Sequence, residues 1–136
     1  MHHMSQNTVQ LLLGSNLNDR NINLMTAQLK IEKEIGEIEK KSKILETSPE
    51  GFESAHDFLN QIIQIKTCLS PISILKIVKK IEKEMGRTYL ETNQKYQDRI
   101  IDIDILKFNQ IKFKSTVLEI PHPQLFSRNF VKKIQI

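Results

Sequence analysis

The sequence predicts an α+β domain whose elements follow the order β-α-β-β-α-β, with additional short strands near the C-terminus. Strand-like runs rich in β-branched and apolar residues alternate with segments whose apolar residues recur at helical spacing. The 136 residues are enough for one domain with a substantial hydrophobic core. No internal repeat or low-complexity segment interrupts the pattern, so we expect residues 7–136 to form a single domain.

The first half of the chain predicts one helix between two strands. Residues 8–14 form a β-branched and apolar run closed by glycine, which is typical of a buried strand. The following stretch "SNLNDRNIN" favours a helix start, because Asn and Asp side chains bond nearby backbone amides. The helix is expected to end at Gly36, in the left-handed conformation of a C-cap residue. Residues 37–47 then predict a second strand.

The second half of the chain repeats the alternation. Residues 48–57 carry Pro, Gly and Ser and predict a long loop of the kind that is often functional. Residues 58–67 predict a third strand, and Ser70 with Pro71 predicts the start of a second helix. Gly86 ends this helix, whose apolar stripe consists of Ile74, Ile77, Val78, Ile81 and Met85.

A polar loop and a last long strand complete the predicted arrangement. The loop spans residues 87–98 and the strand residues 100–108, and Asn109-Gln110 predicts a turn into the short run "IKF". The whole order is typical of a ferredoxin-like sandwich.

Composition limits the class of protein. With 39% hydrophobic and 26% charged residues, the chain is expected to be globular rather than disordered or fibrous. A single cysteine, Cys68, cannot form an intrachain disulfide, and no run approaches the ~20 apolar residues of a membrane span. We therefore expect a cytoplasmic protein. Residues 1–6, which begin "MHH", are expected to be a tag or a disordered terminus. The net charge of +4 indicates polyanionic partners without separating nucleotides from nucleic acids.

Two aspartates interrupt the apolar strand "YQDRIIDIDILKF". Because side chains on a strand alternate between faces, Asp102 and Asp104 point one way and the neighbouring isoleucines point the other. Two close carboxylates resist joint ionisation unless a cation lies between them, and Mg²⁺ is a hard ion that accepts such a pair. An edge strand with a polar solvent face explains the spacing equally well.

Several blocks of the sequence match, in order and at suitable separations, the motifs of one known family. "LLLGSNLNDR" is similar to its L-G-S-N-L block, "SPEGFESAHDFLNQ" to its pterin-side loop, and "IEKEMGR" to its I-E-x-x-x-G-R helix end. "DRIIDIDIL" and "IPHPQLFSRNF" match R-x-x-D-x-D-I-L and P-H-P-x-x-x-x-R-x-F. From about Val9 to Phe130 the chain resembles the 6-hydroxymethyl-7,8-dihydropterin pyrophosphokinase family of folate biosynthesis.

The resemblance implies an ATP side of the site. It makes Asp102 and Asp104 the ligands of two magnesium ions that bridge the ATP phosphates, and it makes Arg87 and Arg99 catalytic through charge neutralisation. A guanidinium suits phosphate because it offers paired N–H donors and stays charged. Taken alone, each arginine could equally be a surface residue, and His122 a turn residue between prolines. The positions that the resemblance assigns to ATP binding are Glu82, Arg99, Ile105, His122 and Arg128.

The resemblance also implies a pterin side. Phe58 and Phe130 match aromatic residues that stack on the pterin ring, and Asn60 matches the residue that recognises its edge. Without the family, two phenylalanines are more often core residues. The remaining positions assigned to the pterin are Thr47, Ser48, Glu50 and Tyr96.

Three departures from the family pattern qualify these assignments. Ser48 and Glu50 replace a proline or an aromatic residue in the pterin-side loop, and Tyr89 lies where many members have a second arginine. Family members usually continue well beyond R-x-F, whereas six residues follow Phe130; a short member and a truncated chain both stay open.

Three other classes of protein share parts of this sequence pattern. An RRM-like nucleic-acid module shares the element order, but its K/R-G-F/Y aromatic pattern is missing from this sequence. A nucleotidyltransferase would place its Gly-Ser turn within about a dozen residues of the acidic pair, unlike Gly14-Ser15 here. A catalytically silent ferredoxin-like domain would have no use for the acidic pair, arginines and histidine together. We therefore expect a monomeric enzyme that binds ATP and a reduced pterin, and neither nucleic acid nor membrane.

Overall fold

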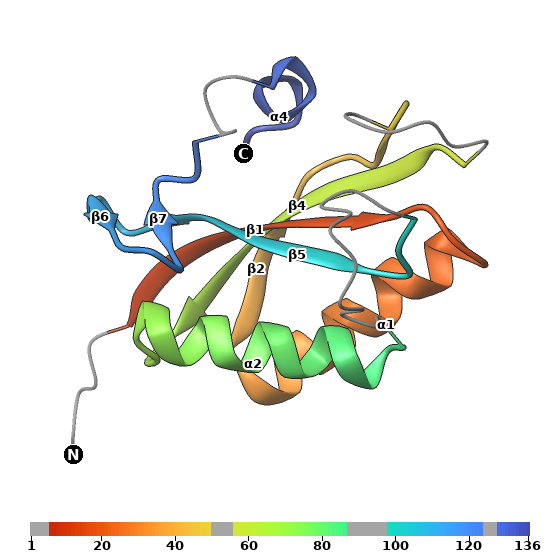
Figure 1. Ribbon diagram of the computed structural model, residues 1–136. Helices are drawn as coiled ribbons and strands as arrows, with labels where there is room; N and C mark the ends of the chain where they lie inside the picture. The colour runs from red at the N-terminus through yellow and green to blue at the C-terminus, as the bar shows by residue number, and fades with distance from the viewer. Residues whose placement is uncertain (1–5, 50–55, 87–97, 124–127) are drawn as a thin grey trace.

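The computed structural model describes residues 6–49, 56–86, 98–123 and 128–136 (Figure 1). They form an α+β domain built on an antiparallel sheet in the order β2-β4-β1-β5, with β3 also paired to β4. The predicted alternation of strands and helices is confirmed. The strands of this sheet are β1 (Asn7–Ser15), β2 (Glu37–Lys41), β3 (Leu45–Thr47), β4 (Phe58–Thr67) and β5 (Asp102–Phe108).

Two long helices cover one face of the sheet. α1 (Arg20–Glu34) and α2 (Pro71–Glu84) lie side by side beneath it (Figure 1). Every second residue of the central strands faces these helices, as the strand period requires. The resulting core cluster includes Leu11 and Leu13 of β1 and Ile103 and Ile105 of β5. This packing fixes which face each aspartate of β5 occupies.

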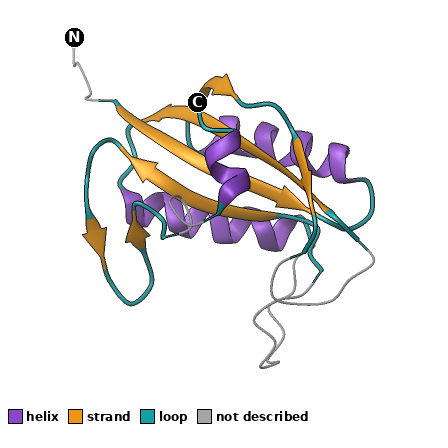
Figure 2. Cartoon of the chain, turned by 90° about the horizontal axis from the view of Figure 1, so that it is seen from above, coloured by secondary structure: helices purple, strands orange, loops and turns teal. Residues whose placement is uncertain are grey.

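A short helix that the sequence did not predict covers part of the other face. α4 (Asn129–Lys133) crosses the sheet on the side opposite α1 and α2 (Figure 2). It packs Phe130, Val131 and the nearby Ile134 against a second buried cluster, whose sheet members are Leu12, Ile62 and Leu106. One turn and a half of helix carries too little periodicity to be seen in a sequence.

The predicted strand 37–47 is wrong as a single element, because it breaks into β2 and β3. The break lies at Ser42, whose backbone N–H donates to the carbonyl of Ile62 over 2.8 Å. The Ser42 hydroxyl in turn accepts the N–H of Ile62, also over 2.8 Å. A side-chain oxygen thus replaces a backbone carbonyl in the ladder, and the chain turns between the two strands.

Both helices begin at side-chain caps. Asp19 accepts the N–H of Ile22 at the start of α1, and Ser70 accepts the N–H of Ser73 at the start of α2, with Pro71 in the first turn as predicted. Gly86 ends α2 with a φ of 101°, which confirms its left-handed conformation.

The predicted left-handed conformation of Gly36 is wrong, since Gly86 is the glycine with positive φ among the described residues. Gly36 is required for a different reason: a Cβ built on it would lie 2.0 Å from the carbonyl oxygen of Lys66. The backbone at the end of α1 therefore approaches β4 too closely for any side chain.

The C-terminal strands form a separate hairpin. Asn109 follows β5 in a turn with a φ of 49°, as predicted. β6 (Phe113–Lys114) pairs with β7 (Glu119–Ile120) in a two-stranded sheet, which confirms the expected short strands. A cis peptide bond joins Ile120 to Pro121. Of the helices in the described ranges, none has the length and apolar character to span a bilayer.

Candidate active site

Asp102 and Asp104 lie on the face of the sheet opposite α1 and α2. Their neighbours Ile103 and Ile105 are buried among the helices, so the acidic side chains must point the other way. In the register of the sheet, Asp102 is opposite Gly14 of β1 and Asp104 is opposite Leu12. The two carboxylates therefore share one face, at adjacent positions along it.

Arg99 joins the acidic pair to an aromatic ring. Its Nη1 lies 3.1 Å from Oδ2 of Asp102, and the Arg99 side chain is 11% exposed. Its guanidinium carbon is 5.9 Å from the centroid of the Phe58 ring. A permanent positive charge thus lies between a carboxylate and a flat apolar surface, where an anionic group and a ring could be bound together.

The environment of Asp104 disfavours its charged form. Burial, together with the negative charges of Asp102 and Glu82, raises the pKa of the Asp104 carboxyl to about 8. In the described ranges no set of three His, Cys, Asp or Glu side chains is arranged as a metal cage. Two partly buried carboxylates on one face instead fit a magnesium ion, which keeps waters and takes phosphate oxygens.

A polar row crosses the open face at the same level. Asn60 of β4 and Asp102 of β5 are both opposite Gly14 of β1, so the three residues share one face on adjacent strands. Cross-strand spacing puts the two outer Cα atoms roughly 10 Å apart. With no side chain on Gly14, the floor between the amide and the carboxylate is flat backbone. A planar molecule could lie there and reach both groups.

The orientation of the Asn60 amide is set by β3. Its Nδ2 donates to the carbonyl of Leu45 over 3.1 Å and to the hydroxyl of Thr47 over 2.8 Å. Its Oδ1 would lie 3.5 Å from a Cβ at Gly14, and so would Cδ1 of Phe58. The amide oxygen and the edge of the ring therefore both border the space above Gly14.

His122 belongs to the C-terminal segment and lies close enough to Asp102 and Arg128 to feel both of their charges. The backbone N–H of His122 donates to the carbonyl of Leu106 on β5 over 2.9 Å. Burial lowers the pKa of the His122 imidazole; the negative charge of Asp102 opposes this, and the positive charge of Arg128 adds to it. His122 is thus held neutral near physiological pH, as a hydrogen-bonding group rather than a cation.

The structure separates the two aromatic residues assigned to the pterin. Phe58 is half-buried beside Gly14. Phe130 is 8% exposed within the cluster under α4, with the Arg128 guanidinium 4.4 Å from its ring centroid. Both rings lie on the open side of the sheet, but Phe130 packs as a core residue one row farther from the Asn60–Gly14–Asp102 row.

The comparison with known proteins shows the family to which this chain belongs. Residues 10–135 match the family model described as 7,8-dihydro-6-hydroxymethylpterin-pyrophosphokinase (HPPK). The chain belongs to the HPPK family. A 2-amino-4-hydroxy-6-hydroxymethyldihydropteridine pyrophosphokinase of Porphyromonas gingivalis is 44% identical over 125 residues, covering 91% of this chain and 85% of the relative. The enzyme of that name from Bacillus subtilis is 36% identical over 126 residues, covering 92% and 74%.

Larger HPPK proteins contain the same domain. A folic acid synthesis protein of Dictyostelium discoideum is 38% identical over 92% of this chain, which spans 18% of that relative. A crystal structure of HPPK-DHPS in complex with substrates is similar in fold, with a TM-score of 0.71 and 17% identity over 95% of this chain. Plasmodium falciparum HPPK-DHPS with SDX-DHP has a TM-score of 0.68 and 18% identity over 96%. This chain spans 39% and 40% of those two chains.

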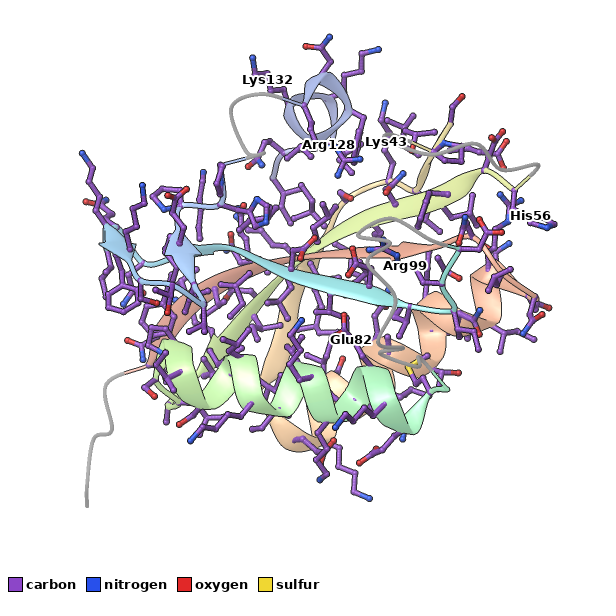
Figure 3. The ribbon with its side chains drawn as sticks, in the orientation of Figure 1. Lys43, His56, Glu82, Arg99, Arg128 and Lys132 are labelled. Carbon is purple, nitrogen blue, oxygen red and sulfur yellow. The ribbon has the colours of Figure 1, made fainter. Side chains whose placement is uncertain are left out.

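Two of the positions that the sequence assigns to ATP have buried side chains. Ile105 is 3% exposed within the main core, so only its backbone is available to a ligand. Glu82 is 0% exposed between α2 and β5 (Figure 3). Its Oε2 accepts the N–H of Ile103 over 2.9 Å. In this position Glu82 contacts the backbone of β5, and its assignment to ATP binding stays a prediction.

Asn16 is a site residue that the sequence analysis missed. It is 1% exposed at the end of β1, and its Oδ1 accepts the N–H of Arg99 over 2.6 Å. Its Nδ2 donates to Asp98 and to the carbonyl of His56 over 2.7 and 3.2 Å. Asn16 thus holds Arg99 beside Asp102. The sequence signal was an Asn directly after a buried strand, where capping is the ordinary explanation.

For several positions named in the sequence analysis the structure gives no contacts or distances. Glu50, Arg87, Tyr89 and Tyr96 lie outside the described residues. Ser48 is described and exposed, and it directly follows Thr47, the last residue of β3.

Proposed function

We propose that this chain transfers the terminal pyrophosphoryl group of ATP to the hydroxymethyl oxygen of 6-hydroxymethyl-7,8-dihydropterin in folate biosynthesis. Membership of the HPPK family supports this reaction. The observation that carries it is the row of Asn60, Gly14 and Asp102, which puts a heterocycle-reading amide beside a carboxylate pair on one open face. The negative charge of that face disfavours the nucleic-acid-binding alternative, because phosphodiesters would be repelled.

The reaction balances without a covalent enzyme intermediate. The hydroxymethyl oxygen forms a bond to the β-phosphorus of ATP, and the bond from that phosphorus to the α,β-bridging oxygen breaks. AMP leaves with the electron pair, and the hydroxyl proton passes to solvent. Catalysis of this kind depends mainly on positioning and on charge neutralisation.

Asp102 and Asp104 would hold two magnesium ions, whose positive charge offsets the charge of the triphosphate. Arg99, held by Asn16, presents its guanidinium to the phosphates from the side of Phe58. The neutral imidazole of His122 and the positively charged guanidinium of Arg128 extend this surface toward the adenosine. The backbone of Ile105 is also in reach there. Arg87 adds charge neutralisation from the segment after α2.

The pterin would lie over Gly14. Its polar edge meets Oδ1 of Asn60, whose Nδ2 is already used by Leu45 and Thr47. Phe58 offers a stacking surface beside it. The segment from Thr47 onward contributes Ser48 and Glu50. The other residues proposed to border the ring are Tyr96 and Phe130.

The architecture and setting proposed for the enzyme follow from the same features. The strand order β2-β4-β1-β5 supports a ferredoxin-like sandwich formed by residues 7–136 as one domain. A monomer in the cytoplasm would suit small-molecule substrates and a single exposed thiol, Cys68.

Nucleotide chromatography tests the proposal. The protein is incubated with ATP, Mg²⁺ and 6-hydroxymethyl-7,8-dihydropterin, and the nucleotides are separated over time. AMP should appear in step with pterin pyrophosphate, because attack is at the β-phosphorus. ADP as the sole product would identify an ordinary kinase, and no pterin-dependent product would leave the fold without this activity.

A further inference from the structure

Glu82 is a buried charged residue that the proposed chemistry does not use. It is 0% exposed, whereas Lys79, Lys83 and Glu84 around it on α2 are exposed. Of the Asp, Glu, Lys and Arg residues that the structure describes, Glu82 alone is fully buried in the core. Glutamate is almost never fully buried unless it is paired. Its position therefore needs a physical reason.

The partner of Glu82 is the backbone between the two aspartates. Its Oε2 accepts the N–H of Ile103 over 2.9 Å, and its Oε1 lies 3.7 Å from Nζ of Lys79. Ile103 belongs to β5, the end strand of the order β2-β4-β1-β5. One side of an end strand has no neighbouring strand to pair with, and a buried N–H there must find another acceptor. Glu82 supplies it from α2.

This contact acts on both acidic side chains at once. Asp102 and Asp104 are each one residue from Ile103, so their Cα–Cβ directions follow from the orientation of its two peptide planes. A charge-assisted hydrogen bond at this point is shorter and stronger than a neutral one. Rotation of β5 about its own axis would turn both carboxylates off the open face together, and the bond to Glu82 opposes that rotation.

The contact also has an electrostatic cost. Glu82 adds a third negative charge near the acidic pair, and this charge contributes to the raised pKa of Asp104. Lys79 offsets it only in part, because its side chain is 52% exposed and screened by solvent. The acceptor oxygen that Glu82 supplies to the N–H of Ile103 is therefore the feature that explains its burial.

We propose that Glu82 is a positioning residue: through the N–H of Ile103 it holds Asp102 and Asp104 on the open face in the geometry that binds divalent cations. The proposal rests on the proposed function of the acidic pair. Outer partners of this kind typically change metal affinity by about 10- to 100-fold when removed.

Three variants of the full chain separate this role from a structural one. Glu82→Met keeps the volume but removes the acceptor oxygen, and Glu82→Gln keeps an acceptor oxygen without the charge. Glu84→Ala is the matched control on the same helix, since Glu84 is exposed and pairs with Lys30 and Lys80. The substrate-free proteins are titrated with Mg²⁺ alone at a temperature well below every Tm. Backbone amide NMR follows Asp102 and Asp104, and hydrogen exchange follows the Ile103 amide.

Glu82→Met should raise Ile103 exchange and increase the half-saturating Mg²⁺ concentration about tenfold. Glu82→Gln should stay within about threefold of the parent, and Glu84→Ala should match it. A Glu82→Met protein with a lower Tm but unchanged Mg²⁺ affinity would overturn the proposal. Equal losses of Mg²⁺ affinity in Glu82→Met and Glu82→Gln would also overturn it. If Glu82→Met does not fold, Glu82→Ala, which also lacks the acceptor oxygen, takes its place in the titration with the same expected and overturning results. None of these measurements depends on catalytic turnover. If the parent protein lacked the proposed activity, the chromatography experiment would show it independently of the Mg²⁺ titration.

Discussion

Asn60 uses the two hydrogens of its side-chain amide inside the protein, one toward Leu45 and one toward Thr47. Its oxygen is thereby turned toward the space above Gly14. Asn60→Ala should remove an acceptor for the pterin edge and cost about 1–3 kcal/mol in pterin binding, while ATP binding changes little. Isothermal titration calorimetry with each ligand measures both. Gln64→Ala, a change on the same strand away from the site, is the control.

An equal loss of affinity for pterin and ATP in Asn60→Ala would indicate a disturbed fold rather than a lost contact. Such a result would remove Asn60 from pterin recognition.

Asp104 makes the stability of the metal-free protein depend on pH. Its carboxyl ordinarily ionises near 3.8, whereas burial and the charges of Asp102 and Glu82 raise its folded pKa to about 8. As pH rises between these values the unfolded chain releases a proton that the folded protein keeps, so the free energy of unfolding falls until the pH exceeds about 8. Asp104→Asn removes this loss and should melt at least about 4 °C above the parent at pH 8, with little difference near pH 4.

Thermal melts in EDTA across this pH range test the predicted change in stability. Rates of pyrophosphoryl transfer test a second expectation for the same variant. Asp104→Asn should lose at least ~100-fold in rate, because a hard anionic ligand is gone. A variant that melts below the parent at every pH yet turns over normally at saturating Mg²⁺ would make Asp104 structural.

At the scale of the elements, two glycines serve different purposes. A Cβ at Gly36 would meet the backbone of Lys66 at 2.0 Å, whereas a Cβ at Gly14 would lie at ordinary contact distance, 3.5 Å, from Asn60 and Phe58. Gly36→Ala should therefore lower the free energy of unfolding by about 3 kcal/mol, since backbone must move. Gly14→Ala should fold normally and weaken pterin binding, because its methyl group occupies the floor of the site. Urea unfolding and calorimetry of the two variants test this contrast; equal stabilities would contradict it.

The sequence predicted those elements whose signals are local. Caps at Ser70 and Gly86 and the alternation around Asp102 and Asp104 depend on neighbouring residues, and the structure has them as expected. The division of the second strand at Ser42 depends on a bond to Ile62, twenty residues away. Periodicity cannot carry information about such a contact.

The same distinction explains the site residues. Strand alternation brought forward Asp102 and Asp104, and the family motif brought forward Asn60; the register that puts Asn60 and Asp102 opposite Gly14 was seen only in the structure. The roles of Asn16 and Glu82 depend on partners 83 and 21 residues away, Arg99 and Ile103, and only the folded chain brings them together.

The whole molecule has a buried cluster on each face of one sheet. Val78 of α2 belongs to the main cluster and Val131 of α4 to the smaller one, and both are 0% exposed. Val78→Ala and Val131→Ala delete the same atoms and should each lower the free energy of unfolding by about 2 kcal/mol, in a single transition. Urea unfolding followed by two probes tests this. A second transition in Val131→Ala would show that the α4 side unfolds independently.

The exposed side of β5 also bears on how the molecule behaves in a crowded solution. An end strand is a template to which a strand of another chain can add, and such addition leads to aggregation. Here Glu82 takes the N–H of Ile103 and the backbone of His122 takes the carbonyl of Leu106, so two of the groups that an incoming strand needs are already used. Asp102 and Asp104, on either side of Ile103, add like charges that would repel a second copy of the same strand. The residues proposed for phosphate chemistry thus also keep the sheet from growing beyond its own chain.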